Sequence, residues 1–309
     1  MQRKFMVALG LLAVTGGMAL SKPKPVATPG SFQLMMITSA STFSGYSTVS
    51  RALTASYTAP QTAPAGATAK MTVPEGLGLV SPLPYTIQNI QGQSGAGTSE
   101  VIHYWNSSAT IPKGQPEILK GQAQADKTTW QGGSSGYPDP LQMKFVKAGQ
   151  FALDETSQVP GSYKVNISYI GELQVDMTAR QQFLAPLNLT QPADSAGVDT
   201  GASIEVSWNH VPGAVGYTVY ASGKNPQGKT VYWENAYHSQ TSWYTQGAAA
   251  AVKAKKLVSP DQCKVTIPAK IFTGQVTLIV TGYSPEVKGK GPLNPWGWAQ
   301  TSATTQLGK

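Results

Sequence analysis

Residues 203–221, SIEVSWNHVPGAVGYTVYA, consist of two alternating runs on either side of a Pro-Gly corner. Each run has one apolar face, formed by Ile204, Val206 and Trp208 in the first and by Tyr217, Val219 and Ala221 in the second. Two such strands joined by a turn are typical of a β-sandwich, whose facing sheets lie about 10 Å apart. A buried Trp removes roughly 150–250 Å² from water. The pattern therefore predicts that Trp208 lies in a core between two sheets.

The same period of two recurs upstream. In YKVNISY (163–169) Tyr163, Val165 and Ile167 share one face, and LQVDMTARQQF (173–183) follows after a short turn. Further short β-like runs are bounded by Gly, Pro, Ser or Asp: FQLMMIT (32–38), RALTASYT (51–58), YTIQNI (85–90), EVIHYW (100–105), LQMKFV (141–146) and FALDE (151–155). Only GAAAAVKAKKL (247–257) has a helical composition, with alanines followed by lysines. The fold class expected is all-β.

The chain divides at changes in composition. Arg3 and Lys4 followed by the apolar stretch 5–20 predict a secretory signal peptide over 1–21, and hence an exported protein. Residues 22–84 form a Pro-rich leader and short β segments that could belong to the first domain. Because Ala185-Pro186 breaks the strand pattern, we predict two antiparallel β-sandwich domains, 85–185 and 186–309. The second carries an insertion with the short helix.

Part of the chain resembles a known family. Residues 187–221, with Trp208 and the Tyr217-x-Val219 pair, resemble the first three strands of a fibronectin type III or related immunoglobulin-like domain. Residues 276–289 and 298–305 resemble its last two strands, so the likeness covers about 186–307. The family commonly has a Tyr before the penultimate strand, where this chain has Phe272. The likeness implies a spacer or interaction module.

A shorter likeness lies upstream. VPGSYKVNISYIGELQV (159–175) resembles the closing hairpin of bacterial immunoglobulin-like modules. It implies an immunoglobulin-like sandwich for 85–185.

Charge and cysteine content exclude several classes. The formal net charge of +8 falls to +6 without Arg3 and Lys4, and the other charges are scattered apart from VKAKK (252–256). A nucleic-acid-binding protein concentrates basic residues on one face, so none is expected as a partner. The single Cys263 cannot form an internal disulfide, and its alternation with Val265 and Ile267 predicts a buried strand thiol rather than a reactive or intermolecular one. After residue 20 the sequence has no run of 18 apolar residues, so no membrane span is predicted.

No catalytic or cofactor motif stands out. His103, His210 and His238 are far apart in sequence, and no metal-ligand spacing is present, so no metal or cofactor is expected. GGSSG (132–136) fits G-x-S-x-G without the strand and helix that a nucleophile elbow needs, and GQSGAG (92–97) lacks the Gly-Lys of a phosphate loop. The acids Asp154, Glu155, Glu172 and Asp176 could supply a glycosidase pair only if two lay about 5–9 Å apart. We therefore expect no enzyme.

Aromatic residues are the remaining hint of function. VYWENAYHSQTSWY (231–244) and NPWGW (294–298) contain the candidate ligand contacts Trp233, Tyr237, Trp243, Tyr244, Trp296 and Trp298. Exposed aromatic rings stack on sugars or anchor protein partners, whereas buried ones pack under loops. Trp296 and Trp298, two apart, would share a face of a strand. The same alternatives apply to Trp105 and Trp130, with less reason to favour binding.

Three functional hypotheses follow. The first is an exported, non-enzymatic surface or extracellular protein that contacts a protein or polysaccharide. The second is a carbohydrate-binding module that uses the aromatic residues. The third is a secreted hydrolase, which would need His103 or His238 in one pocket with a carboxylate and a Ser. Asn106, Asn166 and Asn188 match the glycosylation pattern, which applies only if the source secretes through a eukaryotic pathway.

Overall fold

A computed structural model of the chain describes residues 31–43, 46–59, 64–85, 99–124, 127–131, 144–237 and 247–308. Over these residues the protein is all-β with one short α-helix, as the strand patterns predicted. The predicted signal peptide and most of YTIQNI lie outside the described residues. The described part contains no helix long and apolar enough to cross a membrane.

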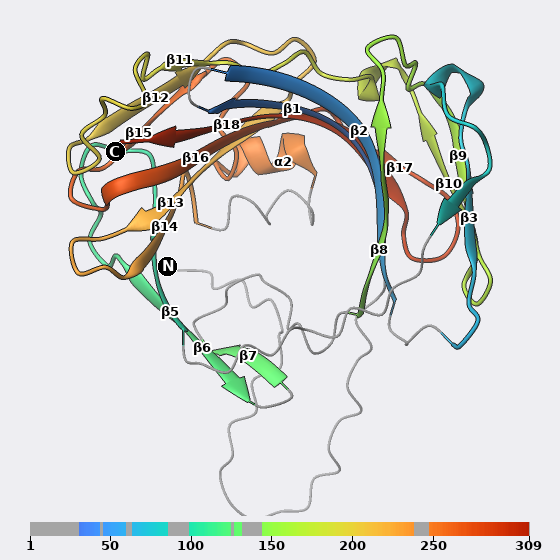
Figure 1. Ribbon diagram of the computed structural model, residues 1–309, viewed down its shortest axis with the longest axis horizontal. Coiled ribbons are helices and arrows are strands. Elements are labelled where there is room, and N and C mark those ends of the chain that lie inside the picture. Colours follow the sequence, from blue (N-terminus) through green and yellow to red (C-terminus); the bar gives the residue numbers. More distant parts are fainter. Residues whose placement is uncertain are drawn as a thin grey trace, which may run out of the picture.

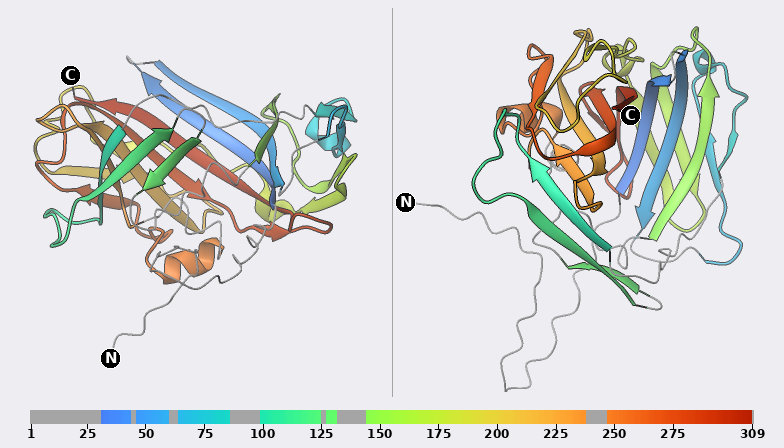
Figure 2. Two further views of the ribbon diagram at one scale, coloured as in Figure 1. Left: turned by 90° about the horizontal axis from the view of Figure 1, so that it is seen from below. Right: turned by 60° about the vertical axis from the view of Figure 1, so that its left-hand side comes forward.

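One large sheet of eleven strands arches across the molecule (Figure 1). Its strands are, in spatial order, β7 (Lys127–Gln131), β6 (Glu117–Gln124), β5 (Ser99–Trp105), β14 (Thr230–Glu234), β13 (Gly216–Lys224), β16 (Thr273–Tyr283), β18 (Trp296–Leu307), β1 (Ser31–Phe43), β2 (Tyr46–Ala59) and β8 (Lys144–Leu153), with β17 (Val287–Lys288) paired to β18. The views in Figure 2 place β5 to β7 at one end of the sheet and β2 and β8 at the other.

Two smaller sheets cover the outer side of the arch (Figure 1). One consists of β11 (Leu189–Gln191), β12 (Ile204–Trp208) and β15 (Lys264–Ile267), and the other of β10 (Gly171–Met177), β9 (Gly161–Ile167), β3 (Ala69–Thr72) and β4 (Leu83–Tyr85). The helix α2 (Ala248–Lys253) lies on the inner side, and two 3₁₀ turns, η1 (Glu75–Leu77) and η2 (Ala179–Gln181), connect strands. The large sheet is thus one layer of two sandwiches, and each of the smaller sheets is the second layer of one of them.

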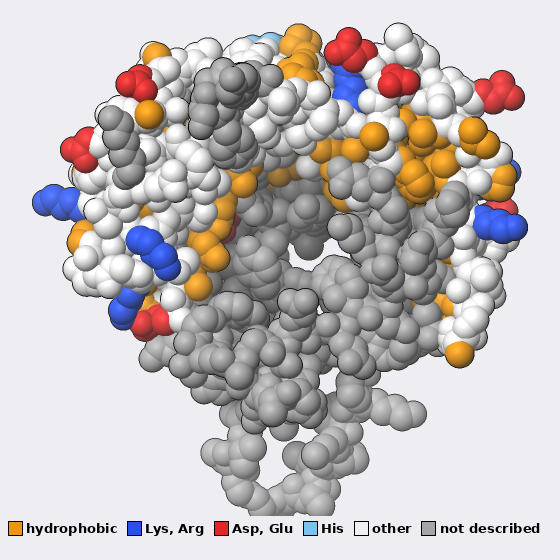
Figure 3. Space-filling view, viewed as in Figure 1, with side chains coloured by type: hydrophobic (Ala, Val, Ile, Leu, Met, Phe, Trp, Pro, Cys, Tyr) orange, Lys and Arg blue, Asp and Glu red, His pale blue; other side chains and the backbone are white. Residues whose placement is uncertain are grey.

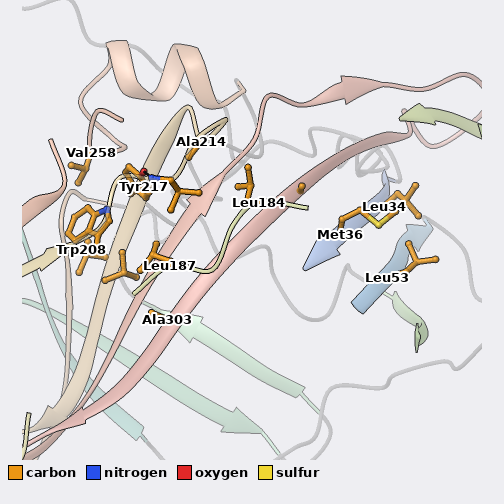
Figure 4. Packing of buried hydrophobic residues seen from close by; sticks show 14 of the residues in the cluster. Leu34, Met36, Leu53, Leu184, Leu187, Trp208, Ala214, Tyr217, Val258 and Ala303 are labelled. Carbon is orange, nitrogen blue, oxygen red and sulfur yellow. Dashed lines mark hydrogen bonds between the residues drawn. The ribbon is translucent and has the colours of Figure 1, made fainter. Parts of the chain in front are cut away.

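The prediction for Trp208 is confirmed. Its side chain is 3% exposed between the β12 sheet and the large sheet, and its ring lies edge-on to that of Tyr217 at 5.3 Å (Figure 4). The Tyr217 hydroxyl accepts a hydrogen bond of 3.0 Å from the backbone N–H of Val211, which ties the Pro-Gly corner to the core. Ile204, Val206 and Val219 are buried with it, so both alternating runs face inward as predicted.

The second alternating pattern is confirmed as well. In β9 the side chains of Tyr163, Val165 and Ile167 are buried while Lys164 and Asn166 are exposed. This apolar face packs toward the large sheet. Because the strand is covered on that side only, buried and exposed side chains alternate along it.

The expectation that all strands pair antiparallel is wrong at two places. β1 runs parallel to β18 from Gln33↔Trp296 to Thr42↔Thr305, and β5 runs parallel to β14. Parallel neighbours need long connections, and these pairs join segments far apart in the chain, which periodicity cannot reveal. One sheet and one continuous apolar core therefore take residues from both sides of the boundary predicted at 185/186. The division into domains stays a prediction.

Candidate functional site

The structure corrects the expectation for two of the candidate aromatic residues. Trp233 and Trp298 are both 0% exposed, so neither can contact a ligand. Trp233 donates its indole N–H to the carbonyl of Asn106 at 3.1 Å. Trp298 packs against Trp296 at 5.1 Å under α2, on the shared face that their spacing predicted. For these two residues the packing alternative holds.

The other candidate aromatic residues have different outcomes. Trp296 is partly exposed and belongs to the cluster under α2, whereas Trp243 and Tyr244 lie outside the described residues. Tyr237 is partly exposed in an open cleft of about 390 Å³. We call this the aromatic cleft; its lining residues are Trp105, Asn106, Pro112, Lys113, Gln115, Asn235, Ala236, Tyr237, Ala254, Lys255 and Lys256. Its volume is within the range of about 300–1,000 Å³ typical of small-ligand sites.

Parallel pairing of β5 and β14 creates one wall of the aromatic cleft. Trp105 is opposite Glu234 in the register, so both strands end together. Beyond that point the N–H of Asn106 donates to the carbonyl of Glu234 at 3.0 Å. The Gln115 side chain then holds the end of β5, because its amide oxygen accepts from Trp105 N–H at 3.0 Å and its amide nitrogen donates to Trp105 C=O at 2.7 Å.

The end of α2 supplies the second wall. The N–H of Lys255 donates to Val252 C=O at 2.9 Å and the N–H of Lys256 to Ala251 C=O at 2.8 Å, the pair of bonds that defines a Schellman motif. Lys255 therefore takes a left-handed conformation with φ 57°. This turn directs the chain into the aromatic cleft, where the Asn235 side chain donates to Lys256 C=O at 3.2 Å.

Trp105 and Tyr237 are in ring contact in the lining of the cleft. Their ring centroids are 4.6 Å apart and the rings are tilted by 54°, an arrangement that aromatic pairs favour. The Lys256 ammonium donates to Tyr237 C=O at 2.8 Å and lies 5.6 Å from the centre of its ring. Hydrogen bonds thus hold the backbone at both residues and the rings contact each other, while part of each residue stays open to solvent. Sequence analysis gave less reason to favour binding by Trp105, whose aromatic neighbour in EVIHYW is Tyr104 alone, than by Tyr237, which lies in a longer aromatic-rich run.

A buried histidine lies beside these two rings. His103 is 3% exposed, and its Nε2 lies 3.2 Å from Glu234 Oε1 while its Nδ1 lies 4.0 Å from Glu117 Oε2. Its ring centroid is 5.5 Å from that of Trp105 and 6.0 Å from that of Tyr237. The three strands β6, β5 and β14 place these groups side by side, although they are distant in sequence.

The His103 group does not complete the hydrolase hypothesis. That hypothesis required a Ser in the same pocket, and the described lining of the aromatic cleft contains neither a Ser nor a carboxylate. His210 is exposed elsewhere and His238 lies outside the described residues. Among the described residues no group of His, Cys, Asp or Glu could hold a metal ion.

The four acidic candidates do not line the cleft. Asp154 and Glu155 follow β8, while Glu172 and Asp176 lie on β10, where hydrogen bonds from Gln174 and Ser162 lower the pKa of Asp176. GGSSG and GQSGAG fall outside the described residues, as does the side chain of Trp130.

Cys263 differs slightly from the prediction of a buried strand thiol. It is half-buried just before β15, and burial raises the pKa of its thiol. Its Sγ donates to Pro260 C=O at 3.5 Å.

Charge distinguishes the aromatic cleft from the rest of the surface. Lys113, Lys255 and Lys256 line it without a carboxylate among the other lining residues. Elsewhere basic and acidic side chains are scattered, as on the face drawn in Figure 3. The cleft therefore combines partly exposed aromatic rings with positive charge.

Comparisons with known proteins give no relative. No family model matches the chain, and neither the curated proteins nor the solved structures contain a match.

Proposed function

We propose that the protein is an exported, non-enzymatic interaction protein built from β-sandwich modules, and that it binds its ligand in the aromatic cleft. One observation carries the proposal: Trp105 and Tyr237 are in ring contact on an open cleft while hydrogen bonds with the Gln115 and Lys256 side chains hold their backbone. Preorganised aromatic residues bind with little loss of conformational entropy, so they are the usual anchors of binding sites.

The sandwich supports a fibronectin type III-like assignment within this proposal. In the C-terminal part, β11, β12 and β15 form one sheet and β14, β13, β16 and β18 occur in that order in the other. A two-sheet arrangement of this kind serves in many cell-surface and extracellular domains. Export is supported by the basic start and the apolar stretch 5–20 of the sequence.

Carbohydrate is the ligand that the cleft fits best. Sugar rings carry apolar C–H faces that pack on aromatic side chains, and hydroxyl groups that need polar partners. The exposed Asn106, on the lining beside Trp105, offers such a partner. A cleft that is open at its surface accommodates part of a longer polysaccharide chain.

The test uses the chain from residue 22 onward, purified and applied to an array of neutral and acidic polysaccharides. We expect binding to at least one of them, with Trp105→Ala and Tyr237→Ala each lowering affinity by about tenfold or more. Trp296→Ala is the matched control, because Trp296 is also a partly exposed aromatic residue but lies in the cluster under α2. Absence of binding to every polysaccharide, or equal loss with Trp296→Ala, would contradict the proposal.

A further inference from the structure

We infer that the aromatic cleft selects an acidic polysaccharide, one whose sugar rings carry carboxylate or sulfate groups. This inference rests on the proposed function, since it names the class of sugar that the same cleft takes. It depends on three features of the cleft: its lysines, the backbone conformation of one of them, and the hydrogen bonds that its backbone has already made.

The lysines give the described lining of the cleft a positive charge without a carboxylate among its residues. Lys113 and Lys255 are exposed, and among the described residues neither has an ion-pair partner. Lys256 is held against Tyr237, with its ammonium within the cleft lining. The nearby carboxylates of Glu117 and Glu234 face His103 instead. An anionic group that enters the cleft therefore meets lysines without a competing carboxylate in its lining.

The backbone at Lys255 points to a role beyond folding. Lys255 occupies the C′ position of the Schellman motif with φ 57°, where Gly is the preferred residue because it lacks a Cβ. A lysine at this position is conformationally unfavourable, and such positions cluster at binding sites. Asn106, on the opposite wall, also has a positive φ of 99°. The fold thus keeps a charged side chain at a position where Gly would fit better.

Hydrogen bonding at the cleft argues against an acidic peptide as the ligand. A peptide commonly binds by adding a strand to an open sheet edge. β5 has β14 and β6 on its two sides, and the N–H and C=O of Trp105 are already bonded to Gln115. Side-chain contacts with lysines and aromatic rings remain, and a charged sugar ring can use both.

The arrangement of charge argues against a nucleic acid. Single-stranded nucleic acids need a basic groove that follows several phosphates in addition to stacking aromatic rings. Three lysines line the cleft, and the other basic residues are scattered over the sequence. The cleft therefore fits a short charged segment of a polymer rather than an extended polyphosphate backbone.

The experiment measures affinity by isothermal titration calorimetry for polygalacturonate and for its fully methyl-esterified form, which has the same sugar without the charge. Carrageenan, a galactan that carries sulfate groups but no carboxylate, is a further arm that distinguishes sulfate from carboxylate. We expect at least one acidic polymer to bind about tenfold more tightly than the methyl ester, and added salt to weaken that binding. Poly-glutamate and a thymidine oligonucleotide are titrated in the same way, as representatives of an acidic peptide and of a nucleic acid.

Lysine variants test whether the cleft is responsible for the preference for acidic polymers. The double variant Lys113→Gln, Lys255→Gln should lower affinity for the acidic polymer roughly three- to tenfold, in line with partly solvated ion pairs. Lys270→Gln is the matched control, because Lys270 is also exposed and also has a left-handed φ, of 67°, but does not line the cleft. Lys255→Gly should raise the thermal midpoint while weakening acidic binding, a combination that a merely structural lysine would not produce.

The outcomes separate the two proposals. Equal binding of polygalacturonate, carrageenan and the methyl ester, all lost in Trp105→Ala, would overturn the inference and leave the proposed function standing. Tighter binding of poly-glutamate or of the oligonucleotide would overturn the inference in favour of that partner. Binding to no polysaccharide would overturn both.

Discussion

Trp208 lies at the centre of the sandwich, but its indole N–H, although buried, has no acceptor among the described residues. Replacing the side chain by Ala removes most of the contact with Tyr217 and leaves a cavity. We expect Trp208→Ala to lower the free energy of unfolding by about 3–5 kcal/mol. Trp208→Phe should cost clearly less, because Phe keeps ring contact and removes a buried donor without a partner.

Urea unfolding followed by circular dichroism measures both variants. Trp296→Phe is the control for loss of an indole, since Trp296 is partly exposed. Equal destabilisation by Phe and Ala at position 208 would show that the indole N–H makes a stabilising contact after all.

Cys263 gives a prediction that depends on pH. Burial raises the pKa of its thiol, which favours the protonated form in the folded chain. The thiolate is the form that reacts with iodoacetamide, so alkylation of the folded protein should increase at a higher pH than alkylation of the urea-unfolded chain. Mass spectrometry of samples quenched between about pH 7 and 10 measures both profiles. A folded profile at or below the unfolded one would be inconsistent with a half-buried thiol.

Single residues also show where sequence patterns stop being informative. Alternation predicted burial of Trp208, because Glu205 and Ser207 mark the other face of β12. Trp233 could not be assigned in this way, because its neighbours Glu234 and Asn235 are polar and are nevertheless buried. These polar residues are satisfied by contacts with His103 and with the backbone N–H of Val219, which only the folded chain provides.

At the scale of elements, β10 meets the β17–β18 segment at a glycine. Gly289 lies where a Cβ would clash with the carbonyl oxygen of Gln174 and would lie 3.0 Å from Val175 Cγ2. Next to it, Lys290 and Gln174 exchange two backbone hydrogen bonds of 2.8 and 2.9 Å. We expect Gly289→Ala to break this bridge and to lower the free energy of unfolding by about 1–3 kcal/mol.

The control for that variant is Gly201→Ala, whose Cβ would meet only the side chain of Asp199, at 3.3 Å. Its effect in urea unfolding should be small. If Gly289→Ala is as stable as Gly201→Ala, then β10 and the β17–β18 segment can separate at little cost, and the bridge does not join the two sheets.

Pairing between elements was only partly predictable. Strands next to each other in the chain, such as β9 and β10, pair as the turn between them implies. β5 and β14 pair although more than a hundred residues separate them, and that pairing brings Trp105 beside Asn235 and Tyr237 in the cleft. A parallel pair carries no turn signal, so the aromatic cleft could not be assembled from the sequence.

At the scale of the whole molecule, the large sheet and its core are continuous. β1 lies between β18 and β2, and Thr38 in β1 donates a buried hydrogen bond of 3.1 Å to Leu184 C=O. The apolar core runs from Leu34 and Leu53 to Trp208 without interruption (Figure 4). β1 and β2, from the segment 31–84 whose role the sequence did not reveal, therefore belong to the layer that both smaller sheets share.

A continuous core predicts one cooperative unfolding transition, because neither end can open without exposing apolar surface of the other. Hydrogen exchange at increasing urea can follow two reporters, peptides of β9 and β10 at one end and peptides of β12 and β15 at the other. We expect both to lose protection at one midpoint. Trp208→Ala, which removes a side chain of β12 at the second reporter's end of the molecule, should then lower both midpoints equally. If only the β12 and β15 peptides respond, 85–185 and 186–309 unfold as separate domains, and β1 is a strand shared between two independent cores.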